Sequence, residues 1–136
     1  MELDEARDFL REHHHAVLHT YREDGSPQLS PVAVGIDDEG RAVVSTRETA
    51  IKVHNLERDP RASLCVFTDR FFGPWHRIDG DATIVRLPEA MESLVDYYRT
   101  LAGEHPNWND YRQAMVRERR VLLRIALTAA GPDIAG

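Results

Sequence analysis

The spacing of apolar and polar residues changes several times along the chain, and each change marks an expected element. Apolar residues at helical spacing predict an amphipathic helix over residues 3–12. The next two apolar segments, 16–22 and 28–36, read as strands and flank the turn-rich sequence EDGSP, so they predict a hairpin. The DDEG turn at 37–40 leads into a strand over 41–46, and the three strands are expected to form a meander.

Shorter elements follow in the middle of the chain. A helix is expected over residues 50–58, and it must end before the Asp-Pro pair at 59–60 because the residue before proline avoids helical dihedral angles. A strand over 61–68 and a long strand over 75–86 come next, joined by the loop DRFFGP. Gly80 lies inside the long strand and predicts a bulge or a bend there.

The last third of the chain returns to helical spacing before a final strand. One helix begins near Pro88 and ends at Gly103, and a second covers 108–117 before a strand over 121–128. Strands and helices do not alternate regularly and no glycine-rich phosphate loop is present, which disfavours a doubly wound nucleotide fold. We therefore predict a mainly β protein with α-helices: a six-stranded antiparallel barrel with peripheral helices, forming a single domain over 1–136.

Composition and charge narrow the function classes. The 136 residues are 42% hydrophobic and 29% charged, as in ordinary globular domains. The formal net charge of -6 argues against a protein that follows the phosphates of a nucleic acid. No apolar run reaches the length of a membrane span and no secretory leader precedes the first helix, so a cytoplasmic protein without membrane attachment is expected. A lone cysteine, Cys65, excludes an intrachain disulfide.

Three adjacent histidines, His13, His14 and His15, raise the question of a metal site. Neighbouring residues of an extended chain point to opposite faces, and no histidine or carboxylate stands nearby at a familiar ligand spacing. No metal site is therefore expected. The histidines are interpreted as the junction between the first helix and the first strand.

Lys52 is the only lysine among 17 basic residues, and it lies where a strand runs into a short helix. Thr46 or Thr49 is expected to cap that helix, whose first backbone N–H groups would be free to bind an anion. Between Arg47 and Arg61 four basic residues face three acidic ones, so this segment is mildly positive in an acidic protein. Two interpretations stand: a cation that binds a small anionic ligand, or a single lysine left in an arginine-rich composition.

Five segments of the chain carry a shared pattern. They are Gly25 to Val32 (GSPQLSPV), Ser45 to Pro60 (STRETAIKVHNLERDP), Arg61 to Ser63 (RAS), Gly80 to Ala82 and Tyr98 to Leu123. Together they resemble the flavin- and deazaflavin-binding split-barrel proteins related to pyridoxamine 5′-phosphate oxidase. The last segment resembles the actinobacterial subgroup that binds the deazaflavin coenzyme F420. The resemblance implies a homodimer with the cofactor in a groove between two split barrels.

The resemblance also implies a set of cofactor-binding residues. Lys52 matches the family lysine that meets the cofactor phosphate, and Asn55 matches the asparagine that follows it in the K..NL pattern. The strand end before Lys52 is expected to line the phosphate-bearing tail, the strand after the first hairpin turn to border the ring system, and Trp75 to lie beside that ring. The full expected set is Gln28, Ser30, Pro31, Val32, Ser45, Thr46, Arg47, Lys52, Asn55 and Trp75.

Two positions depart from the family pattern. Close relatives often carry arginine two residues before the lysine, where this chain has Ala50. Either Arg47 reaches the same anion from the loop or the affinity is weaker. Pro31 replaces a polar residue of some relatives, which removes a side-chain hydrogen bond near the ring.

The resemblance implies an oxidoreductase that uses reduced F420 for hydride transfer to an unsaturated or conjugated small organic substrate. No residue stands out as an obligatory acid, so the catalytic residues are left open. Two alternatives remain. One is an FMN-binding relative of pyridoxamine 5′-phosphate oxidase that uses the same groove, and the other is a non-catalytic protein that stores or carries F420.

Overall fold

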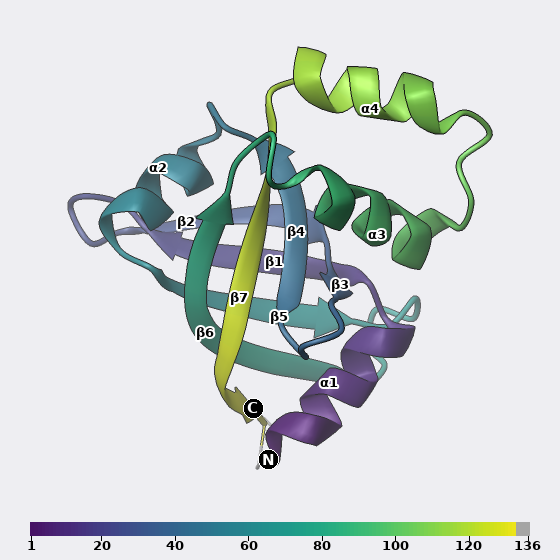
Figure 1. Ribbon diagram of the computed structural model, residues 1–136. Coiled ribbons are helices and arrows are strands. Elements are labelled where there is room, and N and C mark those ends of the chain that lie inside the picture. Colours follow the sequence, from purple (N-terminus) through teal and green to yellow (C-terminus); the bar gives the residue numbers. More distant parts are fainter. Residues whose placement is uncertain (133–136) are drawn as a thin grey trace.

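The computed structural model describes residues 1–132 of the chain, so the last four residues of the predicted domain, 133–136, lie outside the described residues. The helices are α1 Leu3–Glu12, α2 Ile51–Arg58, α3 Met91–Ala102 and α4 Trp108–Arg117; the strands are β1 His15–Tyr21, β2 Pro27–Ala33, β3 Gly35–Ile36, β4 Ala42–Arg47, β5 Arg61–Phe67, β6 Trp75–Val85 and β7 Arg120–Gly131. The described strands form one antiparallel sheet in the order β2-β1-β5-β6-β7-β4-β3 (Figure 1).

The sheet is curled so that its two halves cross. In Figure 1, β2, β1 and β5 run across the view, whereas β4 and β7 run steeply in front of them. β6 belongs to both halves, because its first residues pair with β5 and its last residues pair with β7. The register shifts between Asp79 and Gly80, which confirms the predicted bulge. A Cβ at Gly80 would lie 2.2 Å from the carbonyl oxygen of Ala126, so only glycine allows this approach of the two strands.

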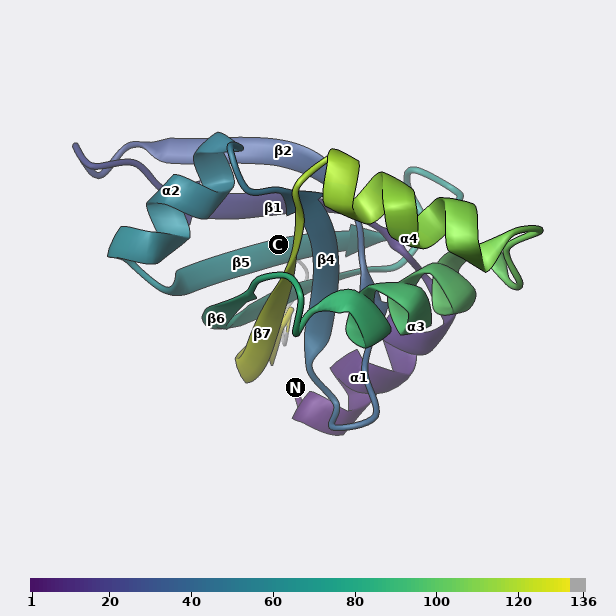
Figure 2. The same ribbon diagram turned by 45° about the horizontal axis from the view of Figure 1, so that its top comes forward.

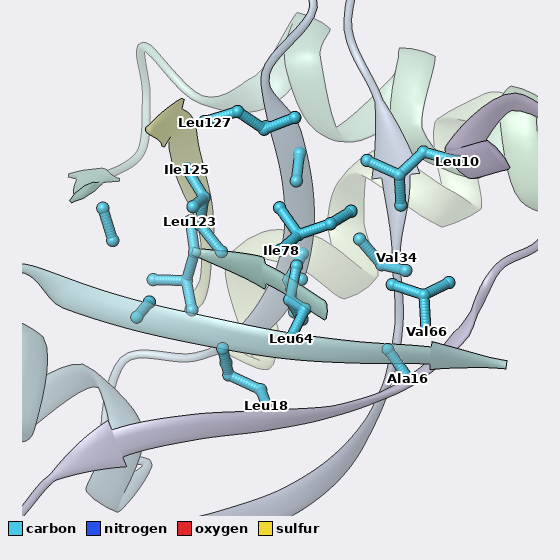
Figure 3. Close-up of a cluster of buried hydrophobic side chains, with 14 of the residues drawn as sticks. Leu10, Ala16, Leu18, Val34, Leu64, Val66, Ile78, Leu123, Ile125 and Leu127 are labelled. Atoms are coloured by element: carbon cyan, nitrogen blue, oxygen red, sulfur yellow. The ribbon is translucent and has the colours of Figure 1, made fainter. Parts of the chain in front are cut away.

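The main core fills the space between the two halves of the sheet. Leu18 and Leu64 come from the β1 and β5 side, and Leu123 and Ile125 come from β7 (Figure 3). Leu10 of α1 packs into the same cluster. All five side chains are almost completely buried, and burying each contributes about 1.5 to 3 kcal/mol.

Helices α3 and α4 build a smaller second cluster on the opposite face of β4 and β7 (Figure 2). Val43 and Leu122 point outward from those strands and pack under Leu94 and Tyr111. The Tyr111 hydroxyl donates to the carbonyl oxygen of Leu94 at 2.7 Å, which ties α4 to α3. Burial raises the pKa of Tyr111 to about 12, so this donor keeps its proton at physiological pH.

The predicted strand over 28–36 is in fact two strands, β2 and β3, interrupted at Val34. β2 pairs with β1 at one edge of the sheet, and β3 pairs with β4 at the other edge. The predicted meander is right in its two pairings, since segment 28–36 pairs with β1 through β2 and with β4 through β3, but wrong in placing the three strands side by side. The count of six strands is wrong for the same reason, since the described sheet has seven. The chain from 27 to 36 instead crosses between the two edges and closes the curl.

Three hydrogen bonds hold the crossing at Val34. The Val34 N–H donates to the carbonyl oxygen of His14 at 2.8 Å. His14 Nδ1 lies 2.9 Å from the Val34 carbonyl oxygen, and since a carbonyl only accepts, Nδ1 must carry the proton. The Tyr97 hydroxyl donates to the carbonyl oxygen of Ala33 at 2.8 Å. The middle histidine of the triplet is thus a structural residue that fixes the path between the sheet edges.

Most predictions of single helices and turns are confirmed. The first helix, the β1–β2 hairpin and the helix over 108–117 are confirmed, and Gly103 ends α3 with a φ of 78°. The predicted threonine cap of α2 is wrong, because its N-cap is Ala50 and no side chain caps it. No helix within residues 1–132 is long and apolar enough to cross a membrane.

The crossing at Val34 predicts a specific stability loss. His14→Ala removes the Nδ1 donor and leaves the Val34 carbonyl without it. We expect the free energy of unfolding to fall by about 1 to 3 kcal/mol, as for a buried acceptor that loses its partner. Urea denaturation measures the loss. The matched control is His54→Ala, because that side chain is 64% exposed on α2 and its removal should change stability by less than about 0.5 kcal/mol. Equal losses would contradict the role of His14.

Candidate functional site

Basic side chains gather where β4 ends, α2 begins and β7 starts. Arg47, the last residue of β4, lies directly opposite Arg120, the first residue of β7. Glu118 Oε1 lies 2.8 Å from Arg120 Nη2 and 3.5 Å from Arg47 Nη2. Its hydrogen bond to Arg120 holds the pKa of Glu118 below its ordinary value. One carboxylate is thus shared between two guanidinium groups, which leaves positive charge in excess.

Lys52 adds a further cation on the first turn of α2. Its side chain is half-buried. Burial, and secondarily the charge of Arg120, lowers the pKa of Lys52. Within residues 1–132 Lys52 makes no ion pair and no hydrogen bond through its ammonium group. A partly desolvated ammonium group beside another cation is unfavourable, and a bound anion would relieve it.

Two more arginines surround the start of α2, but acidic residues compensate them. Arg119 and Arg86 both form ion pairs with Glu48. Arg86 Nη2 also lies 3.4 Å from Glu57 Oε1. The Glu48 N–H donates to the carbonyl oxygen of Arg119 at 2.9 Å, which fixes the loop before the helix. We call Arg47, Lys52 and Arg120 the cationic cluster, because Glu118 is the one carboxylate that the described residues place beside them, and it pairs with the two arginines only.

The N-terminus of α2 faces the same region. Ala50 has extended dihedral angles and caps the helix without a side-chain hydrogen bond. The first N–H groups of a helix have no intrahelical acceptor, and the helix dipole adds partial positive charge there. This end of α2 therefore offers backbone donors beside the ammonium group of Lys52.

A line of polar residues leads from α2 to the inner face of β2. Asn55 lies one turn after Lys52, and its Nδ2 donates to Thr20 Oγ1 at 3.0 Å inside the protein. Thr20 is the β1 neighbour of Gln28. Gln28 Oε1 and Ser30 Oγ are both buried without a hydrogen-bond partner in the described residues. Each such atom costs about 1 to 3 kcal/mol, so this strand is suited to a ligand with polar ring atoms.

A cavity of about 500 Å³ adjoins the cationic cluster on the side of α3 and α4. Ser45 and Arg120 lie on its wall toward the sheet, while Tyr97, Tyr111 and Met115 supply apolar surface. Burial raises the pKa of Tyr97, whose hydroxyl also approaches the backbone of Ser45. The cavity thus places an aromatic wall beside Arg120, and its lining also includes the carboxylates of Asp110 and Glu118.

The structure brings together most, but not all, of the predicted site residues. Arg47 and Lys52 lie with Arg120, and Ser45 lines the adjoining cavity. Asn55 leads to the inner face of β2, where Gln28, Ser30 and the partly buried Val32 lie. Asn55 itself ties α2 to β1 through Thr20, so one of its two amide N–H donors is already used.

Three predicted residues lie elsewhere within this chain. Thr46 is buried and follows Ser45 in β4, so the two side chains point to opposite faces. Pro31 points away from Gln28 and Ser30 for the same reason and is exposed on the outer face. Trp75 starts β6 opposite Phe67, the last residue of β5, whereas α2 ends next to the first residue of β5. Seven strand residues separate these ends, which is about 20 Å.

Arg120 is the functional candidate that the sequence did not reveal. It stands in the run RERR at 117–120, which gives no hint of its partner on β4. Its importance depends on the pairing of Arg47 with Arg120, which joins strands far apart in the chain. It also supplies a cation beside Lys52.

Comparison with known proteins gives a consistent result. Residues 3–131 match the family model described as "Pyridoxamine 5'-phosphate oxidase". Among solved structures, a conserved hypothetical protein from Mycobacterium tuberculosis is 23% identical with a TM-score of 0.75, covering 100% of this chain and 92% of that one. An F420 reductase is 19% identical with a TM-score of 0.71, covering 92% and 94%.

A further similar structure is HutZ, the heme storage protein from Vibrio cholerae. It is 19% identical with a TM-score of 0.70, and the match covers 96% of this chain and 94% of that one. At such identities a structural likeness shows a common fold. Proteins of different function therefore share the curled sheet described above.

The position of Lys52 predicts that removing its charge stabilises the ligand-free protein. Folding lowers the pKa of Lys52 from 10.5, so the folded protein binds this proton less tightly than the unfolded chain does. The penalty is complete at neutral pH, and it disappears as pH rises through the folded pKa toward 10.5. Lys52→Met keeps a long unbranched side chain but removes its charge, and it should raise Tm at neutral pH. Thermal unfolding followed by circular dichroism measures this.

The control for this prediction is Arg22→Met, which removes a charge from an exposed residue of the β1–β2 turn. Its effect on Tm should be small at every pH. The difference between the two variants should shrink as the solution approaches the ordinary lysine pKa. A lower Tm for Lys52→Met at neutral pH would show that the ammonium group stabilises the fold and would contradict the account.

Proposed function

Because the chain belongs to the pyridoxamine 5′-phosphate oxidase family, we propose that it is an oxidoreductase that binds a flavin or deazaflavin by its phosphate group. Lys52 carries this proposal: it is half-buried beside Arg120 and has no carboxylate partner within residues 1–132. A phosphate would pair with both cations and accept from the free N–H groups of α2. Arg47 contributes to the same field through the shared Glu118.

The finer proposal is that the cofactor is F420. The segment from Tyr98 to Leu123 resembles the F420-binding subgroup, and an F420 reductase is among the similar folds. FMN is the alternative, because its phosphate would meet the same cations. The two orphaned atoms on β2, Gln28 Oε1 and Ser30 Oγ, fit the polar edge of either ring system.

The residues of this chain would bind and orient rather than react. Bound reduced deazaflavin supplies a hydride for an unsaturated or conjugated substrate. Lys52 and Arg120 would fix the phosphate, and the inner face of β2 would fix the ring so that one face stays open to the substrate. The aromatic cavity beside Ser45 would exclude water. No side chain is assigned as the proton donor.

We further propose that the protein acts as a homodimer. The outer face of β2, β1 and β5 carries Leu29, Pro31, Val17 and Phe67, and Leu29 is 60% exposed. This face continues into the loop at 69–74, where Phe72 is 93% exposed. Exposed apolar side chains that lie next to one another favour association. Pro31 and Trp75, which point to this outer face, would then lie at the subunit boundary.

The experiment that tests the function compares the two cofactors directly. The purified protein is titrated with F420 and with FMN, and binding is followed by fluorescence. Tighter binding of F420, followed by oxidation of reduced F420 in the presence of an enone or quinone acceptor, supports the proposal. Tighter binding of FMN would show that FMN, and not F420, is the cofactor. Binding of F420 without turnover of any conjugated acceptor would favour a carrier, and binding of neither would refute the proposal.

The phosphate assignment predicts the effect of one substitution. Lys52→Ala should weaken binding of the preferred cofactor by about 1.5 to 3 kcal/mol, the range for a hydrogen bond to a charged group. Fluorescence quenching titration measures it in a variant whose fold is checked by circular dichroism. Arg22→Ala is the matched control, because Arg22 is exposed on the β1–β2 turn. Unchanged affinity in Lys52→Ala would discard the assignment.

The proposed interface predicts a change of oligomeric state. Val17 lies in the middle of the outer face, between Pro31 and Cys65 on the neighbouring strands. Val17→Arg should convert the dimer into a folded monomer, because a buried unpaired charge is costly at an interface. Val116→Arg places the same charge on α4, where Val116 is 60% exposed, and should leave the dimer intact. Analytical ultracentrifugation measures the oligomeric state of both variants. A dimer that persists in Val17→Arg would contradict this interface.

A further inference from the structure

A second cavity of about 460 Å³ lies on the other side of Tyr97 from the Ser45 cavity. The β3–β4 turn over 37–41 forms one wall, and α3 forms another. β4 and β7 form its floor through Val43 and Arg124. Tyr97 lines both cavities, and its hydroxyl is held by the carbonyl oxygen of Ala33. Tyr97 therefore forms part of the wall of both cavities.

The floor of this cavity holds an arginine without a carboxylate partner. Arg124 is half-buried, and its Nη2 donates to Ser93 Oγ at 2.8 Å. It forms no ion pair with any residue in 1–132. The other two arginines that line the cavity, Arg41 and Arg99, hydrogen bond carboxylates at 2.7 Å and 2.9 Å. Most of the five guanidinium donors of Arg124 remain open to an oxygen-rich ligand.

The mouth of the cavity carries the opposite charge. Asp38 and Asp96 are exposed, and neither carboxylate forms an ion pair within the described part of the chain. The neighbouring Asp37 and Glu39 are both occupied by Arg41. The cavity thus has an arginine without a carboxylate partner at its floor and two exposed carboxylates without a cationic partner in its lining.

We propose that this cavity binds a small zwitterion, an amino acid in the broad sense. Its carboxylate would sit on the fork of Arg124 beside the Ser93 hydroxyl, with the geometry that arginine and a carboxylate prefer. Its ammonium group would lie at the mouth near Asp38 and Asp96. A plain dicarboxylate would bring charge against the acidic mouth, and a diamine would bring charge against Arg124, so both should bind worse.

This site is separate from the proposed cofactor site. Arg120 and Arg124 point to the same face of β7 because they are four residues apart, which is about 13 Å along the strand. Leu122 lies between them and is buried. The proposed zwitterion binding can therefore be tested independently of the proposed cofactor binding.

The test is a titration of the whole protein followed by the backbone amide signals in NMR. The probes are glycine, β-alanine and γ-aminobutyrate, with succinate and putrescine as matched single-charge-type ligands. At least one amino acid should give saturable shifts at Ser93 and Arg124 and bind about tenfold more tightly than succinate or putrescine. Absence of saturable binding, or succinate binding as tightly as every amino acid, would overturn the proposal.

Substitutions localise the binding. Arg124→Gln should weaken binding of the amino acid by about tenfold or more. Arg124→Lys should have an intermediate affinity, because it keeps the charge but loses the paired donors of the guanidinium group. Arg22→Gln, on the exposed hairpin turn, should change nothing. If Arg124→Gln fails to fold, Asp38→Asn takes its place as the test, because Asp38 is exposed and its substitution should not disturb the fold. Asp38→Asn should weaken binding of the amino acid but not binding of succinate. Equal affinity in the decisive variant and the native chain would overturn the assignment.

Discussion

The continuous segment from residue 27 to residue 36 is the constraint on which the rest of the structure depends. It forms one edge of the sheet as β2 and the other edge as β3. A sheet whose two edges belong to one extended segment has to curl, and the crossing point, Val34, is completely buried. His14 and Tyr97 hold its backbone. The curl brings α2 against β1 and places β4 beside β7, so the cationic cluster exists because of this closure.

The electrostatics of the cluster follow from that geometry. Folding places Lys52 beside Arg120 and partly removes it from water, and both effects disfavour its charge. Nothing within the described residues compensates this charge with a carboxylate. Functional sites commonly keep such unfavourable charges because a ligand relieves them. The orphaned side-chain atoms on β2 have the same character, since each lacks a partner that a bound ring would provide.

Local features were predictable from the sequence, and distant pairings were not. Helical spacing and turn residues located α1, α4, the first hairpin and the bulge at Gly80, because each depends on neighbouring residues. The break at Val34 has no signal of its own in the strand-like segment 28–36, since it arises from the closure of the sheet. Arg120 was missed for the same reason, because its value depends on a strand more than seventy residues earlier. The two-residue period of strands, however, already implied that Thr46 and Pro31 face away from their neighbours.

The central claim is that Lys52 and Arg120 form a phosphate site, and a comparison of phosphorylated and dephosphorylated cofactors tests it most directly. FMN and riboflavin share one ring system and differ by the phosphate alone, whereas F420 is compared with its deazaflavin-ribitol core, which lacks the phosphate and the tail attached to it. Affinities are measured by fluorescence titration for the native protein and for Lys52→Ala. The account predicts that the native protein prefers the phosphorylated member by about 1.5 kcal/mol or more and that Lys52→Ala loses most of this preference. An equal preference in both proteins would show that the phosphate binds elsewhere.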